Sequence, residues 1–301
     1  MVIDGDGAEP LSNRRRLAAE LHRVRDLAGI SGRELAHRIG ISQSKVSRIE
    51  SGTAIPSAPE VTAWAEAVAA SAETKRLLTA LTEAAFTEVH PWRAVLKDRL
   101  HLQDDIQELE NRAGKVRTFQ PSVIPGLLQT AEYARRLFSV IDPPYAESDI
   151  PAAVAARLDR QLALFEEHRK FEFLITEAAL RWRPGPSTLL QAQFDRIESL
   201  RTLSNVSIGL IPHAVLARAC TSHSFAIFEL ADVGGHDTDG EEAPNAIVTV
   251  ETVHANLVVS NPDSVGLYQA RWHRLEQMAI YGDEIRAFLS GVGHSVRALE
   301  A

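Results

Sequence analysis

The sequence has very little cysteine and no long apolar run. Cys220 is the single thiol among 301 residues, so no disulfide can form within the chain, which is typical of a reducing compartment. No apolar run approaches the ~18 residues that a membrane-spanning helix needs. Residues 1–16, MVIDGDGAEPLSNRRR, lack the apolar centre of a signal peptide. We therefore expect a cytoplasmic protein with no membrane partner.

Signatures of catalysis are scarce as well. The sequence contains no G-x-S-x-G, no P-loop and no H-E-x-x-H. GVGHSV, residues 291–296, has two of the glycines of a dinucleotide-binding loop, but it follows a predicted helix rather than a strand. We interpret it as a break in that helix. We expect no enzyme activity and no catalytic residues, with an enzyme that carries a DNA-targeting domain as a remaining alternative.

Metal and cofactor signals are weak. GHDTDGEEAPNA, residues 235–246, resembles a calcium loop, but Gly and Ala stand at its first and twelfth positions, where carboxylates are needed. An acidic hairpin loop explains it better. His213 and His223 flank Cys220, but no fourth ligand is evident for a zinc ion. We expect neither a metal site nor a cofactor.

The chain has no overall excess of basic residues, yet its charge is uneven. The formal net charge is −8. Residues 12–55 hold nine Lys and Arg against four Asp and Glu, a local charge of +5, so the rest of the chain carries −13. Local charge matters more than total charge for DNA binding. A basic module attached to an acidic body is the simplest interpretation.

SGRELAHRIGISQSKVSRIESG, residues 31–52, predicts two short helices in immediate succession. Ser31 and Glu34 have the spacing of a capping box, in which each side chain satisfies a free backbone N–H of the other. Gly40 can take the left-handed conformation that ends a helix, and Ser42 can cap the next one. Helices this short must bury their apolar sides against neighbours. A tight turn between them indicates a helix-turn-helix.

The second short helix has polar residues suited to DNA. Val46 and Ile49 are expected to face the core, which turns the remaining positions outward. Gln can pair with adenine, Arg with guanine or phosphate, and Lys or Ser with phosphate. We predict base readout by Gln43 and Arg48 and phosphate contact by Lys45; the alternative is an ordinary solvated helix face. The predicted DNA-binding residues are Arg33, Ser42, Gln43, Ser44, Lys45, Ser47 and Arg48.

LAHRIGISQSKVSRIESGTAIPS resembles the helix-turn-helix of the phage-repressor-like (Xre) transcriptional regulators. The resemblance covers roughly residues 12–85 and implies sequence-specific binding to double-stranded DNA, usually as a homodimer. Relatives often carry, at the position of Gly32, a Gln that braces the first base-reading Gln. Gln43 is therefore either less constrained here or supported by Arg33.

Changes in composition and apolar pattern along the chain predict four segments. β-rich runs cluster late in the sequence instead of alternating strictly with helices, which favours an α+β domain with a mainly antiparallel sheet. A helix with a short apolar pattern, Leu96 to Leu109, precedes it and could be a dimer seam, as could the C-terminal domain. The segments are a disordered N-terminus (1–11), an all-α helix-turn-helix domain (12–88), a linker helix (89–114) and an α+β regulatory or partner-binding domain (115–301).

Several polar residues interrupt the apolar pattern of this last domain. Arg157, Arg160 and Gln161 share one face of a predicted helix, and Glu177 follows a predicted strand. Buried charges need partners, so we predict an Arg–Glu network. It is either structural or a site for a ligand or protein partner. The other polar members of this set are Glu110, Gln129 and Tyr133.

A second resemblance concerns residues 95–285. TFQPSVIPGLLQTAEYARRLF, ARLDRQLALF and FEFLITEAALRW are similar to the antitoxin-like, Scr-family C-terminal domain of actinomycete Xre regulators. Such regulators often lie beside a gene for a very small protein. The resemblance implies a transcriptional regulator controlled through its C-terminal domain, by that small protein or by a small-molecule effector. The alternative is an antitoxin-like protein that neutralises the small partner and binds DNA for autoregulation.

Overall fold

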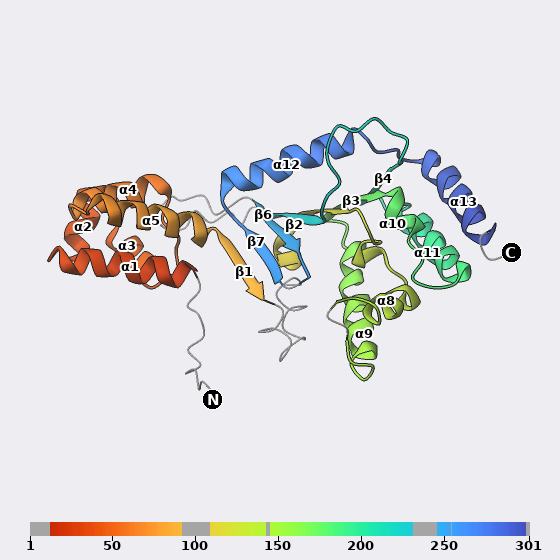
Figure 1. The fold of residues 1–301 in the computed structure, drawn as a ribbon, viewed down its shortest axis with the longest axis horizontal. Helices are drawn as coiled ribbons and strands as arrows, with labels where there is room; N and C mark the ends of the chain where they lie inside the picture. Colours follow the sequence, from red (N-terminus) through yellow and green to blue (C-terminus); the bar gives the residue numbers. More distant parts are fainter. Residues whose placement is uncertain (1–12, 92–108, 143–144, 231–245, 254, 299–301) are drawn as a thin grey trace, which may run out of the picture. The chain divides into compact units, whose positions relative to one another are not determined.

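The computed structural model describes residues 13–91, 109–142, 145–230, 246–253 and 255–298, and the chain divides into two compact units (Figure 1). The described residues up to Glu88 form the first unit, and those from Val89 onward form the second. Residues 1–11, predicted to be disordered, and 92–108, the middle of the predicted linker helix, lie outside the described residues.

The described part of the first unit is a helical bundle, as the sequence predicts. Its core contains Leu21, Leu35, Trp64 and Leu78, all of them fully buried. None of these helices is long enough to be stable alone in water, so this shared core stabilises them. The helices are α1 (Asn13–Leu27), α2 (Gly32–Ile39), α3 (Gln43–Glu50), α4 (Ala58–Ala67) and α5 (Ala72–Ala85).

The turn between α2 and α3 forms through the predicted local interactions. Gly40 ends α2 in the left-handed conformation, with φ +74°. The Ser42 hydroxyl accepts a hydrogen bond from the backbone N–H of Lys45, and Ser31 accepts one from Glu34. The Glu34 carboxylate pairs with Arg38 instead of returning to Ser31. The predicted capping box is therefore only half formed.

The second unit is built on one sheet, in which β2 is a central strand. The strand order is β1-β7-β6-β5-β2-β3-β4, and the pairing registers of β2 to β7 are defined. Successive side chains of a strand point to opposite faces, and both faces of this sheet are covered. The strands are β1 (Thr87–Pro91), β2 (Ala113–Gln120), β3 (Lys170–Thr176), β4 (Val206–Ile211), β5 (Phe225–Leu230), β6 (Ala246–Glu251) and β7 (Ala255–Val259).

The prediction of a mainly antiparallel sheet is wrong, because the sheet is mixed. β3 pairs parallel with both β2 and β4, while β5, β6 and β7 continue the other side of β2 with antiparallel pairs. Parallel neighbours need a crossover connection, and helices lie between β2, β3 and β4 in the chain. The sequence pattern indicated the strands from β2 onward, but it missed β1 and did not show which strands pair.

Helices cover the two faces of this sheet. Phe173, Ile208 and Phe228 belong to a core cluster shared with α11 and α13. Phe119 and Val248 belong to another, shared with α12. The helical elements are η1 (Gly126–Leu128), α8 (Ala131–Phe138), α9 (Ile150–Arg160), η2 (Gln161–Phe165), α10 (Glu177–Arg181), α11 (Ser187–Leu200), α12 (Pro262–Glu276) and α13 (Asp283–Ala298).

Two further expectations need correction. Residues 87–91 form β1 and residues 113–120 form β2, so 89–114 is not one linker helix. Residues 291–296 do not break a helix, because α13 runs through them. Gly293 is buried against α11, where an added Cβ would lie 3.2 Å from Oε1 of Gln191. This glycine serves close helix packing. The predicted acidic loop, up to residue 245, lies outside the described residues.

Candidate DNA-reading surface and ligand cavity

The exposed front of α3 carries most of the predicted DNA contacts. Gln43, Ser44 and Ser47 are exposed, while Val46 and Ile49 are buried in the bundle. The first backbone N–H groups of a helix have no partner within the helix, and they favour contact with phosphate. The exposed polar side chains lie beside these groups at the start of α3. The remaining three residues flank this front, with Ser42 as N-cap, Arg48 half-buried and Arg33 exposed on α2.

Lys45 does not lie on this exposed front. Its side chain is 4% exposed, and its Nζ lies 2.5 Å from Oε1 of Glu60 in α4. Lys45 precedes the buried Ile49 by four positions, so the two share a helix face. That spacing was the sequence signal for burial. The prediction that Lys45 faces outward is therefore wrong.

Glu60 connects the start of α4 to α3. Its carboxylate also accepts hydrogen bonds from the backbone N–H and the hydroxyl of Ser57, at 2.9 and 3.0 Å. Burial raises the pKa of Glu60, but the hydrogen bonds from Lys45 and Ser57 outweigh burial and hold the pKa below its ordinary value. The Glu60 carboxylate is therefore ionised at neutral pH, and its contact with Lys45 fixes the position of α3.

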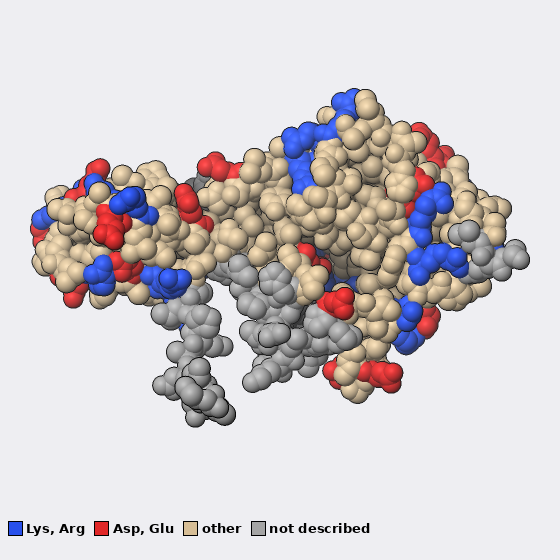
Figure 2. All heavy atoms as spheres, viewed as in Figure 1, with Lys and Arg blue, Asp and Glu red and all other residues tan. Residues whose placement is uncertain are grey.

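Four of the nine basic residues in residues 12–55 pair with acidic side chains within the first unit. Arg25 lies 2.5 Å from Glu50, and Figure 2 shows acidic and basic side chains interspersed on the visible face of the first unit. Arg16 and Arg33 are exposed and form no ion pair within the described residues. They are the better candidates for phosphate contact. The bases with acidic partners are Arg23, Arg25, Arg38 and Lys45.

In the second unit, the predicted Arg–Glu network exists, and its carboxylate is Glu110 rather than Glu177. Arg160 at the end of α9 contacts Glu110 twice, at 2.5 Å from Nη2 and 3.0 Å from Nε. Burial lowers the pKa of Arg160, but the Glu110 carboxylate outweighs burial and raises the pKa above its ordinary value. Glu110 is itself buried. The charge of Arg160 is therefore neutralised locally.

Arg157, one turn earlier on α9, is not matched by a carboxylate. Its Nη1 donates a hydrogen bond of 2.9 Å to Oε1 of Gln129, and its guanidinium lies 4.8 Å from the ring centre of Phe138. No acidic side chain in the described part of the chain forms an ion pair with it. Burial, followed by the like charge of Arg160, lowers the pKa of Arg157 to about 10. Arg157 thus remains a cation at neutral pH.

Gln161 and Glu177 have separate structural partners. Nε2 of Gln161 donates to the carbonyl groups of Gly126 and Gln129, at 3.1 and 2.8 Å, and so holds the η1 segment. Glu177 accepts from the backbone N–H of His213 at 2.8 Å and pairs with Arg181. The structure thus brings Arg157, Arg160 and Gln161 together, but it does not add Glu177 to their network.

A cavity of about 640 Å³ lies beside Arg157 and Arg160. Its lining comes from segments far apart in the chain, including strands β2, β3 and β5, so no local pattern predicted it. Gln129 and Gly126 line it next to Arg157. Gly126 has a steric role, because an added Cβ would lie 2.8 Å from Nη1 of Arg157. The large apolar residues of the lining include Val116, Phe173, Trp182, Phe225 and Phe228.

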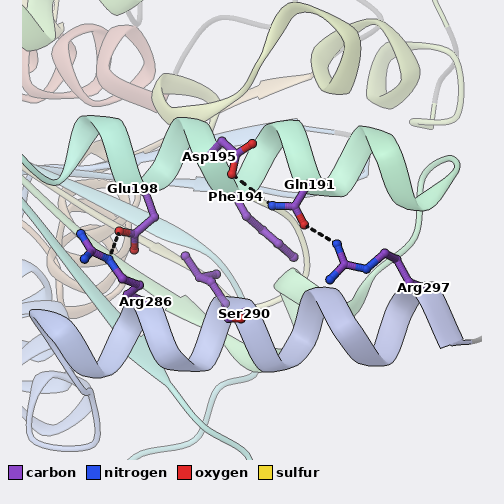
Figure 3. Close-up of a pocket in the computed structure, with 8 residues that line it drawn as sticks. Gln191, Phe194, Asp195, Glu198, Arg286, Ser290 and Arg297 are labelled. Atoms are coloured by element: carbon purple, nitrogen blue, oxygen red, sulfur yellow. Dashed lines mark hydrogen bonds and ion pairs between the residues drawn. The ribbon is translucent and has the colours of Figure 1, made fainter.

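A smaller groove of about 240 Å³ lies between α11 and α13 (Figure 3). Its polar side chains bind one another. Arg286 donates to Glu198 at 3.2 Å, and Arg297 donates to Gln191 at 3.1 Å. Phe194 lies between the two helices in Figure 3. These mutual contacts make the groove a helix-packing seam rather than a binding site.

Two family models match the sequence. A family described as a domain of unknown function (DUF5753) matches residues 103–291, which is more than half of the chain. A family described as a helix-turn-helix domain matches residues 16–78. The second match spans α2 and α3, so it supports a DNA-binding helix-turn-helix at this surface. No curated protein matches the chain.

Among solved structures, the chain is similar to TrmBL2, an archaeal chromatin protein whose structure shows a novel mode of DNA binding. The identity is 11%, the TM-score is 0.27, and the match covers 89% of this chain and 99% of that one. At so low a TM-score the likeness carries no conclusion. Within the described residues, no helix is long and apolar enough to cross a membrane, and no three His, Cys, Asp or Glu side chains are grouped to hold a metal ion.

Proposed function

Because the chain belongs to the DUF5753 family and carries an N-terminal helix-turn-helix domain, we propose that it is a sequence-specific transcriptional regulator of the Xre type, controlled through its second unit. The observation that carries the proposal is the exposed front of α3. There Gln43, Ser44 and Ser47 project beside a helix N-terminus, while the opposite side of the helix is anchored in the core. A reading helix needs this combination of a rigid back and a polar front.

Base readout falls to Gln43 and Arg48, and phosphate contact to Arg33 and the capped start of α3. A Gln amide can make two hydrogen bonds to adenine, and an Arg guanidinium can do so with guanine. Arg33 lies in the first turn of α2, is exposed, and has no acidic partner among the described residues. Its charge is available to the DNA backbone, in contrast to that of Lys45.

The test is a binding comparison on an operator selected from random DNA. Gln43→Ala should weaken binding to the operator by about 1–3 kcal/mol, relax the preference at one base pair and leave random DNA nearly unaffected. Arg33→Ala should weaken both kinds of DNA and reduce the salt dependence of binding. The matched control is Arg76→Ala, an exposed arginine on α5, which should change neither. Equal losses on operator and random DNA for Gln43→Ala would contradict the assignment.

A homodimer completes the proposal. One reading helix contacts only a few base pairs, so regulators of this type place two helices on half-sites about 34–36 Å apart, or a multiple of that distance. The apolar sides of α1 to α5 are used in the local bundle. We therefore assign dimerisation to segments beyond residue 88, with a small protein or a small molecule acting through the second unit.

A second candidate function is supported by an apolar stripe on the second unit. Leu158, Leu162 and Phe165 follow one another at helical spacing along α9 and η2, and they are 37%, 65% and 56% exposed. This stripe suits an antitoxin-like protein that captures a small partner protein and binds DNA for autoregulation. The double variant Leu162→Asp, Phe165→Asp should then abolish co-purification with the small protein encoded next to the gene. If such a protein co-purifies equally with the variant, the stripe is not its docking surface.

A further inference from the structure

The cavity beside α9 has the size and composition of a small-molecule site. Its volume of about 640 Å³ lies within the range of roughly 300–1,000 Å³ that is usual for such sites. Most of its wall is apolar, contributed by the sheet and by aromatic residues such as Phe228 and Trp182. Its polar groups converge on one side, where Arg157, Gln129 and the Arg160–Glu110 pair lie.

Arg157 is the group in this cavity whose hydrogen-bond donors are mostly unused within the described residues. A guanidinium has five N–H donors, and within the described residues the single hydrogen bond from Arg157 goes to the neutral amide of Gln129. Its Nε is shielded from solvent and has no hydrogen-bond partner there. A cation held among protein atoms with one neutral acceptor is poorly compensated. An oxyanion that approached from the cavity would supply the missing charge.

The surroundings limit the charge of the ligand to a single negative unit. Arg160 forms an ion pair with Glu110. Arg157 is therefore the cation of the two that has no ion pair among the described residues, and the more distant charges of Glu251 and Glu110 act on it. Two further carboxylates, Asp142 and Glu251, are exposed members of the lining and would repel additional negative charge. Polyphosphates and nucleic acid therefore do not suit this cavity.

We propose that this cavity binds an amphipathic monoanion, whose carboxylate or sulfonate pairs with Arg157 and whose apolar body lies against the sheet. Gly126 allows the close approach of Arg157 to the chain, and Gln129 orients the guanidinium. The inference deepens the proposed control of the second unit and rests on that function only for the effect of the ligand on DNA binding. Binding itself needs no DNA.

The experiment uses two fluorescent probes with the same rings. 8-Anilinonaphthalene-1-sulfonate carries a sulfonate, and N-phenyl-1-naphthylamine lacks it. Each is titrated against the full-length protein without DNA. Arg157→Gln should lower the affinity for the sulfonate probe about tenfold or more, because that probe loses a charge-assisted pair. The affinity for the neutral probe should change by less than about twofold. Arg157→Lys should restore part of the loss, since it returns the charge without the fork geometry.

Two further variants locate the bound probe. Ala226 lies on β5 in the lining of the cavity. Ala226→Phe should fill part of the cavity and lower the affinity for both probes. The matched control is Arg135→Gln, an exposed arginine on the neighbouring helix α8, which should change neither. Thermal unfolding of each variant verifies the fold. If Arg157→Gln fails to fold, Arg157→Lys and Ala226→Phe still decide the question.

Several results would overturn the inference. The first two concern Arg157→Gln: an unchanged affinity for the sulfonate probe, or an equal loss of affinity for both probes. The third is an Ala226→Phe variant that binds both probes as tightly as the wild-type protein. The fourth is the absence of saturable probe binding to the wild-type protein. Each leaves the operator prediction for Gln43 intact, because that prediction is measured on DNA. The two proposals can therefore fail separately.

Discussion

Lys45 illustrates how one side chain can be assigned to the wrong surface. It stands among residues that face outward, but its position four residues before Ile49 places it on the buried side. Its aliphatic stem follows the apolar core, and its charge reaches Glu60 on another helix. A residue type that suits phosphate is here used to hold α3 in place.

Removal of Lys45 should therefore affect folding before DNA binding. Lys45→Ala leaves the Glu60 carboxylate partly buried without its main partner and should destabilise the first unit by about 3 kcal/mol. The double variant Lys45→Met, Glu60→Gln should cost much less, because no unpaired charge remains. Thermal and urea unfolding of residues 1–88 measure both. Lys75→Ala, an exposed lysine on α5, is the control and should change stability by less than about 0.5 kcal/mol. A similar small effect for Lys45→Ala would contradict the structural role.

Acid should weaken the first unit through the same carboxylate. The folded pKa of Glu60 is lower than its ordinary value of 4.5, as is that of Glu50 beside Arg25 and His22. A carboxyl group with a lowered folded pKa adds stability that is fully present above its unfolded pKa and is lost as the pH falls through the folded pKa. Unfolding midpoints should thus fall below about pH 4.5. The Lys45→Met, Glu60→Gln variant should lose less stability over this range, and an unchanged pH dependence would exclude Glu60 as a source.

At the scale of elements, α13 shows why a glycine pair need not end a helix. Gly291 and Gly293 both lie within α13, but their surroundings differ. Gly293 is buried against Gln191 and Phe194 of α11, whereas a Cβ at Gly291 would meet nothing within 4 Å. Packing against α11 keeps this stretch helical despite the conformational freedom of glycine.

The two glycines form a matched pair of sites for substitution. Gly293→Leu should destabilise the second unit by about 1–3 kcal/mol, because α13 would be forced away from α11. Gly291→Ala should stabilise it by about 0.5–1 kcal/mol, because alanine favours the helix and meets no obstacle there. Unfolding of the full-length protein, followed by circular dichroism, measures both changes. Equal effects at the two positions would show that the contact with α11 does not matter.

At the scale of the whole molecule, the two units have separate cores and different charge. The first holds the helix-turn-helix match and the basic segment, and the second holds the matched domain of unknown function and most of the acidic excess. Each can be described without the other, since each buries its own apolar residues. This division is consistent with a reading head attached to a sensing or docking body.

The division makes a prediction about assembly. Full-length protein should be dimeric by light scattering, and residues 1–88 should be monomeric and bind the operator much more weakly, because a single reading helix contacts too few base pairs. The fragment has a complete core of its own, so poor folding would not explain weak binding. A monomeric full-length protein that still binds its operator tightly would rule out the proposed dimer.

The sequence by itself determined the local structure of this protein. Ser42 and Gly40 bound the two short helices through interactions with their immediate neighbours, and runs of apolar residues marked the strands from β2 onward. These elements were predictable from short windows, whereas β1 was not. The front of α3 followed from the same periodicity. Arg157, Arg160, Glu110 and Gln129 were identifiable as polar residues in an apolar setting, but the sequence did not show which of them pair.

Only the tertiary structure decided what depends on distant residues. The parallel pairing of β2 with β3, the pairing of Lys45 with Glu60 and that of Arg160 with Glu110 all join segments whose separation no local pattern encodes. The cavity beside Arg157 exists because strands, η1 and α9 converge around it. Side-chain periodicity reports which face of an element is buried, whereas the identity of the covering group is settled when the chain packs.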